Sequence, residues 1–391
     1  VTGKDVYRRV VEEVSSYVLG DLTSPEGAFY SAEDADSEGE EGRFYTWKRS
    51  EVHKHLGSEE GDLFCRRFDI TGPGNFERGL SILRLSEDLE SMAEELGITL
   101  GTLEGRLEKA RRSLLKERER RERPSRDDKI IAGWNGLMIA ALARASRVLS
   151  NPGMLEAARK CADFVLGSMR KEGRLYRSRR GDELGVPGFL EDYAFIVWGL
   201  IELYEAGLEV RYLREAVALT EGMIDLFSDS SGLYNFSGHD SEALISRVKD
   251  LHDGATPSGN SVAAMNLLRL ARMTGKSDFN AEAEKILKPA SAQALANPAG
   301  FTYLMSAVDF YLGPTGEIVV SGDPEDPVTK QMLLRVQQAF LPNTVFLFRS
   351  QDESTPEIDR VSDFTGSLGT VPGEPAVFWC EGFTCRKPIT E

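Results

Sequence analysis

One sequence unit occurs three times along this chain. Each copy runs from a glycine and an apolar–Tyr pair, through an acidic turn, into a strongly apolar helix. The copies are Gly173-Arg-Leu175-Tyr176 leading to Glu191-Asp192-Tyr193, Gly232-Leu233-Tyr234 leading to Asp253-Gly254 and Ser258-Gly-Asn260, and an interrupted Gly27-Ala-Phe29-Tyr30 leading to Asp127-Asp128-Lys129 and Trp134-Asn135. Tyr176 and Tyr234 are 58 positions apart. A period of two helices plus loops predicts an array of helical hairpins.

Apolar periodicity predicts that the helices come in pairs, followed by a further helix at 300–311. In each pair the first helix is the more apolar, and 190–206 has almost no polar face, so it should be buried all round. Alternation of buried inner and exposed outer helices is what an α/α barrel requires. The predicted pairs are 134–149 with 154–170, 190–206 with 209–227, and 258–273 with 278–288.

The remaining segments differ in character. Residues 4–19 read as an amphipathic helix, 60–100 as irregular, and 102–123 as a charged helix. A hairpin is expected to join Phe29-Tyr30 to Phe44-Tyr45-Thr46-Trp47 around the acidic loop 33–41. Strands at 317–321, 345–348 and 376–379, with a helix at 327–340, predict a β-α-β unit and a further strand.

We therefore expect a mainly α fold with two domains. Residues 1–312 would form a partial α/α barrel, interrupted by an inserted segment at about 48–124. Residues 313–391 would form a small α/β domain.

The composition of the chain argues against nucleic-acid and membrane partners. A formal charge of −16 and a pI of about 5.0 repel phosphate backbones, so no nucleic-acid partner is expected. No apolar run reaches the length of a membrane span, so no membrane association is expected. Four cysteines are too few for a disulfide framework and suit a reducing compartment such as the cytoplasm. Cys380 and Cys385 lack CxxC spacing and are expected to be small core residues.

The three acidic turns are the candidate catalytic groups. Asp128, Asp192 and Asp253 each precede or open an inner helix, and a barrel would bring them to one rim. A helix N-terminus stabilises a carboxylate in its charged form, which suits a base or a binding group. The alternative is that they only cap helices. His252, beside Asp253, is a candidate for proton transfer.

A second set of polar residues is expected to bind the substrate. It consists of Trp134, Asn135, Glu191, Tyr193 and Asn260, with Asp34 and Asp36 on a loop that could close over the barrel mouth. That loop resembles the opening of an EF-hand, but Tyr45 stands where the bidentate Glu belongs, so calcium is not expected. His53 and His55 lack a third ligand, so no metal is expected. No nucleotide or hydrolase fingerprint appears, and no cofactor is expected.

Four segments together carry a family resemblance. They are Gly27 to Tyr45, Asp127 to Met138, Asp253-Gly-Ala-Thr-Pro-Ser-Gly-Asn-Ser261 and Cys380-Glu-Gly-Phe-Thr-Cys385. The chain resembles the thioredoxin-domain-containing proteins of the spermatogenesis-associated protein 20 type over essentially its whole length. The resemblance implies a thioredoxin-like domain followed by a six-hairpin α/α barrel, similar to those of sugar epimerases and glycosidases. This chain starts at Val1 without an initiator Met, and we expect it to lack that domain and the first barrel helices, leaving the barrel incomplete.

Two functions remain open from the sequence. In the first, the barrel binds a carbohydrate-like polar small molecule, as an epimerase or isomerase using His252, or as a glycoside hydrolase using two carboxyl groups. In the second, it is a non-catalytic binding or scaffolding module serving the absent thioredoxin-like domain. Acids gathered around one cavity would favour the enzyme, and acids bonded only to helix amides would favour the scaffold.

Overall fold

The computed structural model describes residues 2–242, 246–351, 356–368 and 374–390. The chain divides into two compact units. One consists of the residues up to Ser31 and from Asp128 onward, and the other is Ala32–Asp127. This division starts the second unit earlier than the insertion expected at about 48–124, and it draws no boundary at 312/313, so the two-domain boundary there stays a prediction.

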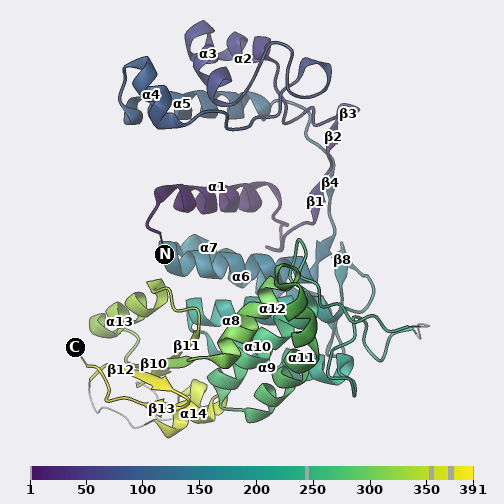
Figure 1. The fold of residues 1–391 in the computed structure, drawn as a ribbon, viewed down its shortest axis with the longest axis vertical. Helices are drawn as coiled ribbons and strands as arrows, with labels where there is room; N and C mark the ends of the chain where they lie inside the picture. Colours follow the sequence, from purple (N-terminus) through teal and green to yellow (C-terminus); the bar gives the residue numbers. More distant parts are fainter. Residues whose placement is uncertain (1, 243–245, 352–355, 369–373, 391) are drawn as a thin grey trace. The chain divides into compact units, whose positions relative to one another are not determined.

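Helical hairpins build the first unit (Figure 1). After α1 (Asp5–Asp21) they are α6 (Ala132–Leu149) with α7 (Pro152–Ser168), α8 (Leu190–Gly207) with α9 (Val210–Phe227), and α10 (Gly259–Thr274) with α11 (Ser277–Ala296), followed by α12 (Thr302–Leu312). α8 packs between α6 and α10, and α10 also packs on α12. The predicted pairs are confirmed to within a few residues, except that α11 continues through Pro289.

The inner helices are the buried ones, as expected. α8 and α10 are buried along most of their length, whereas α9 and α11 bury one face. Glycines let the inner helices approach closely. A Cβ on Gly136 would lie 2.5 Å from the backbone of Phe195, and one on Gly199 would lie 2.7 Å from the carbonyl oxygen of Gly136. Any larger side chain at this crossing would force α6 and α8 apart.

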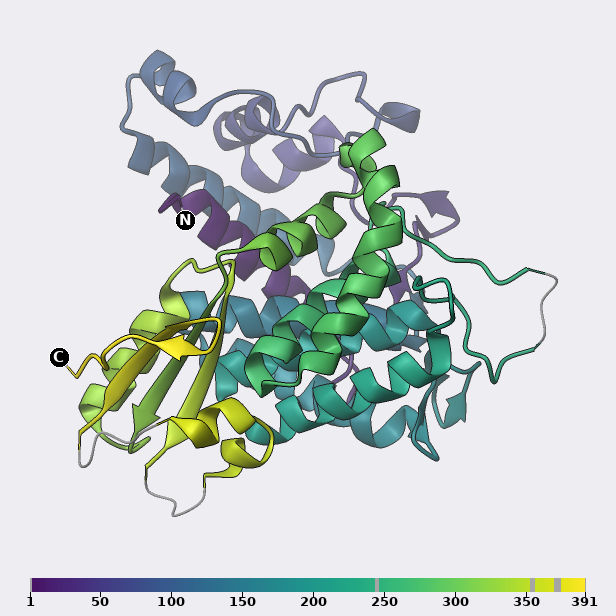
Figure 2. The same cartoon turned by 60° about the horizontal axis from the view of Figure 1, so that its bottom comes forward.

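A four-stranded sheet packs onto these helices. β10 (Gly316–Gly322) runs parallel to β11 (Thr344–Ser350) and antiparallel to β12 (Ala376–Glu381), and β12 pairs with β13 (Thr384–Cys385). Helix α13 (Pro327–Gln338) joins β10 to β11, which confirms the predicted β-α-β unit. The sheet, lime to yellow at the left of Figure 2, lies beside the helices and shares their core through one face. Two short helical segments, η3 (Glu357–Arg360) and α14 (Asp363–Ser367), precede β12.

The fold is therefore mainly α, an incomplete α/α barrel with a C-terminal α/β part. Short strands connect the hairpins: β5 (Ile130–Ile131), β6 (Arg170–Lys171), β7 (Arg174–Leu175), β8 (Ser178–Arg180) and β9 (Glu183–Leu184), with the 3-10 turn η2 (Pro298–Gly300) before α12. One expectation for this unit is wrong. Cys380 and Cys385 are not simply small core residues, because they form a disulfide.

The second unit is helical with short strands. It contains β1 (Ala32–Glu33) paired with β4 (Arg126–Asp127), β2 (Asp36–Ser37) paired with β3 (Glu40–Glu41), α2 (Arg49–Leu56), α3 (Ser58–Arg67), η1 (Glu77–Gly79), α4 (Leu89–Leu96) and α5 (Leu100–Arg118). Two expectations are wrong here. The hairpin is β2–β3 rather than a pairing of Phe29 with Trp47, and residues 60–100 contain α3 and α4. Helix α3 was missed because most of its residues are charged or polar, and its buried apolar stripe around Leu63 and Phe64 is short.

Candidate functional site

The repeat appears in the structure as a recurring set of hydrogen bonds between a side chain and the backbone. The Phe29 N–H donates to Asn135 Oδ1 at 2.8 Å, and Asn135 Nδ2 donates back to the Phe29 carbonyl at 2.9 Å. Asn260 makes the same two bonds with Tyr234, at 2.9 and 3.0 Å. Both amides are buried, so these two predicted binding residues hold the preceding loop to the start of an inner helix.

The middle copy uses a tyrosine instead. The Leu175 N–H donates to the Tyr193 hydroxyl at 2.9 Å. Phe29, Leu175 and Tyr234 each stand two residues after a glycine of positive φ, so they are the equivalent positions. The repeat as defined by the spacing of Tyr176 and Tyr234 is therefore wrong by one residue. The equivalent positions are counted from the glycine of positive φ and not from the tyrosine.

Asp192 is buried at the start of α8. Its Oδ1 accepts from the Gly133 N–H at 3.0 Å and its Oδ2 from the Phe189 N–H at 2.9 Å. Arg177 Nη1 lies 3.4 Å from Oδ2 and 2.7 Å from Glu191 Oε1. Burial raises the pKa of Asp192 to about 6, against the opposing effect of these donors. The carboxyl group thus joins the first turns of α6 and α8.

This raised pKa predicts a pH dependence of stability. Between about pH 4 and 6 the folded chain holds a proton on Asp192 that the unfolded chain has released. The contribution of Asp192 is therefore most favourable below pH 4, declines as pH rises, and levels off above about 6. We expect the stability difference between wild type and Asp192→Asn to shrink over this window, measured by urea unfolding at several pH values. A difference that grew with pH would mean that the backbone donors outweigh burial.

Asp253 plays a similar part for the next two helices. Its Oδ1 accepts from the Ser258 N–H at 2.9 Å, and its Oδ2 accepts from the Tyr303 and Leu304 N–H groups at 2.8 and 3.1 Å. It links the loop before α10 to the first turn of α12. Its neighbour His252 is exposed, with its ring edge-on to Phe301 at 6.1 Å.

The other predicted residues take no part in these hydrogen bonds. Asp128 is half exposed and pairs with Arg180 at 2.5 Å, and Trp134 is half exposed. Asp34 and Asp36 belong to the second compact unit, where the Asp36 N–H donates to Asp34 Oδ1 at 3.1 Å. None of the eleven predicted residues lines the largest of the cavities described below. The carboxylate oxygens of Asp192 and Asp253 accept hydrogen bonds mainly from backbone N–H groups.

A cavity of about 740 Å³ lies instead among the inner helices, where the α/β part packs against them. It is bounded by the C-terminal half of α6, the middle of α8 and α10, the first turns of α12, and the segment from α13 to β11. Its polar and aromatic lining includes Arg144, Arg147, Trp198, Glu202, Glu205, Arg269, Tyr303, Asp309, Gln337 and Asn343.

Two buried glutamates of α8 organise the charged wall of this cavity. Glu202 lies 2.8 Å from Arg269 and 3.2 Å from Arg147, with the more exposed Arg144 at 3.8 Å. Glu205 lies 2.6 Å from Arg147 and 3.1 Å from Arg269. Each acid thus bridges α6 and α10, the inner helices on either side of α8.

The arginines keep Glu202 charged. Burial alone would raise its pKa, but Arg269, Arg144 and Arg147 lower it to about 2. Burial likewise acts to lower the pKa of Arg269, and the two glutamates raise it well above its ordinary value. Glu202 therefore stays ionised at any physiological pH and has no proton to donate.

Sequence reasoning missed this cluster although a signal was present. Arg144 and Glu202 are 58 positions apart, as are Arg147 and Glu205, which is the interval of the repeat. Beyond its acidic first turn this helix is almost wholly apolar, and the two acids in that part require buried partners. On α6, Arg144 and Arg147 stand one repeat interval before these acids, whereas Arg269 on α10 does not follow that interval.

An aromatic pair adds two ring faces, inclined to each other, to the cavity. The rings of Trp198 and Tyr303 lie 5.0 Å apart between centroids, at an interplanar angle of 51°. Nearby, Asn343 Nδ2 donates to Asp309 Oδ2 at 2.8 Å. Aromatic faces beside hydrogen-bonding groups are the usual lining of sites for polar organic ligands.

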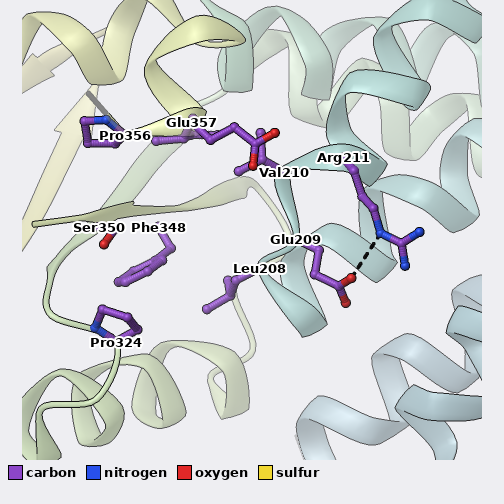
Figure 3. A pocket seen from close by; sticks show the side chains of 10 residues that line it. Leu208, Glu209, Val210, Arg211, Pro324, Phe348, Ser350, Pro356 and Glu357 are labelled. Carbon is purple, nitrogen blue, oxygen red and sulfur yellow. Dashed lines mark hydrogen bonds and ion pairs between the residues drawn. The ribbon is translucent and has the colours of Figure 1, made fainter. Parts of the chain in front are cut away.

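A second cavity, of about 450 Å³, lies where the α8–α9 turn meets the sheet (Figure 3). Leu208, Pro324 and Phe348 form its apolar side. Arg211 and Glu209 interact with each other at 3.1 Å, as the dashed line in Figure 3 shows. This cavity is smaller than the one among the inner helices, and charged side chains are paired within the protein in both.

Two further classes of site are absent from the described residues. No group of three His, Cys, Asp or Glu side chains there is placed to hold a metal ion. Among the same residues, no helix has the length and apolar character needed to cross a membrane.

Comparison with known proteins identifies the family. No family model matches the chain. It is 31% identical to human spermatogenesis-associated protein 20 over 430 aligned residues, an alignment that covers all of this chain and 54% of the human protein. The rat protein of the same name matches with the same identity and coverage. The chain belongs to the spermatogenesis-associated protein 20 family. It spans about half the length of these family members.

Solved structures offer looser likenesses to this family member. A GH76 alpha-mannanase of Bacteroides thetaiotaomicron is 15% identical with a TM-score of 0.39, covering 63% of this chain and 71% of the mannanase. The unsaturated glucuronyl hydrolase of Bacillus sp. GL1 is 14% identical with a TM-score of 0.34, covering 41% of this chain and 45% of the hydrolase. At such TM-scores neither likeness bears on what this chain does.

Proposed function

We propose that the cavity among the inner helices binds a carbohydrate-like polar small molecule, and that this part of the protein is a binding module rather than a hydrolase. The observation that carries the proposal is the Trp198–Tyr303 pair beside arginine, glutamate and amide side chains in a cavity of about 740 Å³. Sugars present apolar ring faces and hydroxyl edges, which suit an aromatic platform and charged hydrogen-bonding groups respectively.

The charges of the cavity argue against hydrolysis. A glycoside hydrolase needs one carboxylic acid with a raised pKa to protonate the leaving group. The pKa of Glu202 is lowered to about 2, and both oxygens of Glu205 face arginines. An epimerase using His252 is also disfavoured, because His252 does not line this cavity.

Calorimetric titration with a panel of neutral hexoses, uronic acids and hexose phosphates tests the proposal. We expect one class to bind, and Trp198→Ala to weaken it about tenfold, a loss of about 1.4 kcal/mol from the missing platform. Trp134→Ala is the matched control, because Trp134 is half exposed and lies outside the cavity.

Three results would contradict the proposal. The first is no binding by any of the three sugar classes. The second is equal binding by wild type and Trp198→Ala. The third is loss of binding in Trp134→Ala alone, which would return the site to the helix starts predicted from the sequence.

A further inference from the structure

The disulfide between Cys380 and Cys385 closes the hairpin of β12 and β13, where the two residues are direct cross-strand partners. We propose that this bond is a thiol–disulfide exchange site, attacked by a dithiol reductant at Cys385 Sγ. Nothing in the proposed sugar-binding function calls for such a bond. Its burial, its register and the contacts of the hairpin turn support the exchange role.

The two sulfurs differ in access. Cys380 is fully buried in the main hydrophobic core, whereas Cys385 packs against that core but is only half buried, between the exposed residues Thr384 and Arg386. An incoming thiolate must reach a sulfur directly, so Cys385 is the one it meets. Cys380 then becomes the leaving group.

The hairpin is held in place by more than the disulfide. Glu317 is the partner of Cys380 on the other neighbouring strand, so its side chain lies on the same face of the sheet. Its Oε2 accepts from the Phe383 N–H at 3.2 Å, and Arg272 lies 3.1 Å from its Oε1. The Phe383 ring packs against Phe364 at 5.1 Å. The two sulfurs therefore stay close after the bond opens, which makes the exchange reversible.

Stabilising the fold is a weak role for this bond. The two cysteines are five positions apart, and a cross-link that closes so short a loop restrains the unfolded chain least.

The other two cysteines are protected from this chemistry. Cys65 and Cys161 are buried thiols, and burial raises the pKa of Cys65 to about 11 and that of Cys161 further still. Few of these thiols are ionised at neutral pH, so they react slowly. They serve as internal controls.

The exchange balances as two steps. One thiolate of the dithiol attacks Cys385 Sγ, a mixed disulfide forms, the bond to Cys380 breaks, and Cys380 leaves as a thiolate that takes a proton from water. The second thiolate of the reductant then attacks the reductant's first sulfur, which is bonded to Cys385 in the mixed disulfide. Cys385 leaves as a thiolate and takes a proton from water. The dithiol is oxidised to a cyclic disulfide and the protein gains two electrons and two protons.

The first test uses the native wild-type chain. We expect dithiothreitol at neutral pH to reduce the bond within minutes, with alkylation and mass spectrometry finding label at Cys385 and none at Cys65 or Cys161. The melting temperature should change by no more than a few degrees on reduction. A bond reduced only after denaturation, or a reduced protein that unfolds, would overturn the proposal and leave a structural cross-link.

The second test asks which sulfur is attacked. With oxidised glutathione as the probe, folded Cys380→Ser should form a mixed disulfide at Cys385 at least tenfold faster than Cys385→Ser forms one at Cys380. Equal rates, or the reverse order, would overturn the assignment of Cys385. Wild-type kinetics of reduction decide the exchange itself even where a variant folds poorly.

Discussion

Replacing Glu202 by glutamine is expected to lower the free energy of unfolding by about 3–5 kcal/mol. The side chain is 1% exposed, and its carboxylate faces Arg269 at 2.8 Å and Arg147 at 3.2 Å, both themselves largely buried. Glutamine keeps the shape but removes the charge, which leaves these guanidinium groups with too little compensation inside the protein. Urea denaturation followed by circular dichroism measures the loss.

Glu325→Gln is the control for this substitution. Glu325 pairs with Lys330 at a similar 2.8 Å, but both side chains are largely exposed to water. Its loss should change stability by less than about 0.5 kcal/mol. If Glu202→Gln were as mild as the control, the cluster would not be the buried network described above.

The second large effect is expected at Asp253. Asp253→Asn should destabilise the protein by about 1.5–3 kcal/mol, because both carboxylate oxygens accept backbone N–H groups. An amide has one acceptor oxygen, so its NH2 group would face either Ser258 or the Tyr303 and Leu304 donors. The same denaturation experiment measures the loss.

Asp326→Asn provides the comparison. Asp326 caps α13 through Oδ2 alone, which accepts from the Thr329 N–H and hydroxyl. Asparagine caps a helix nearly as well as aspartate, so the cost there should be only a few tenths of a kcal/mol. Equal costs at Asp253 and Asp326 would show that Asp253 is an ordinary cap, as a sequence argument alone would have it.

The helical framework was predictable because apolar periodicity is a local property. The residues 190–206 have almost no polar face, and a helix of that kind can only be central. The interval between copies of the repeat then predicted how neighbouring helices pair. The second unit was less predictable, because α3 and α4 are short and mostly charged, so their apolar stripes span only a few residues.

The candidate site was not predictable in the same way. An aspartate at a helix start looks alike in a sequence whether it serves a ligand or a backbone amide, and only the structure shows that Asp192 and Asp253 are occupied by amides. The role of Glu202 depends on arginines of α6 and α10, which lie far from it in the sequence. The Cys380–Cys385 bond escaped a search for CxxC because it spans a hairpin turn rather than a helical one.

The alternating charges of the inner helices bear on how the array assembles. Apolar helices of similar length fit one another in many orders, so hydrophobic packing alone selects an order weakly. With arginines on α6 and α10 and glutamates on α8 at matching depth, only one arrangement pairs every buried charge. Contact between α6 and α10 would set Arg147 against Arg269, and sliding α8 by one turn would separate its acids from their partners. The cluster thus specifies both the order of α6, α8 and α10 and the register in which they pack.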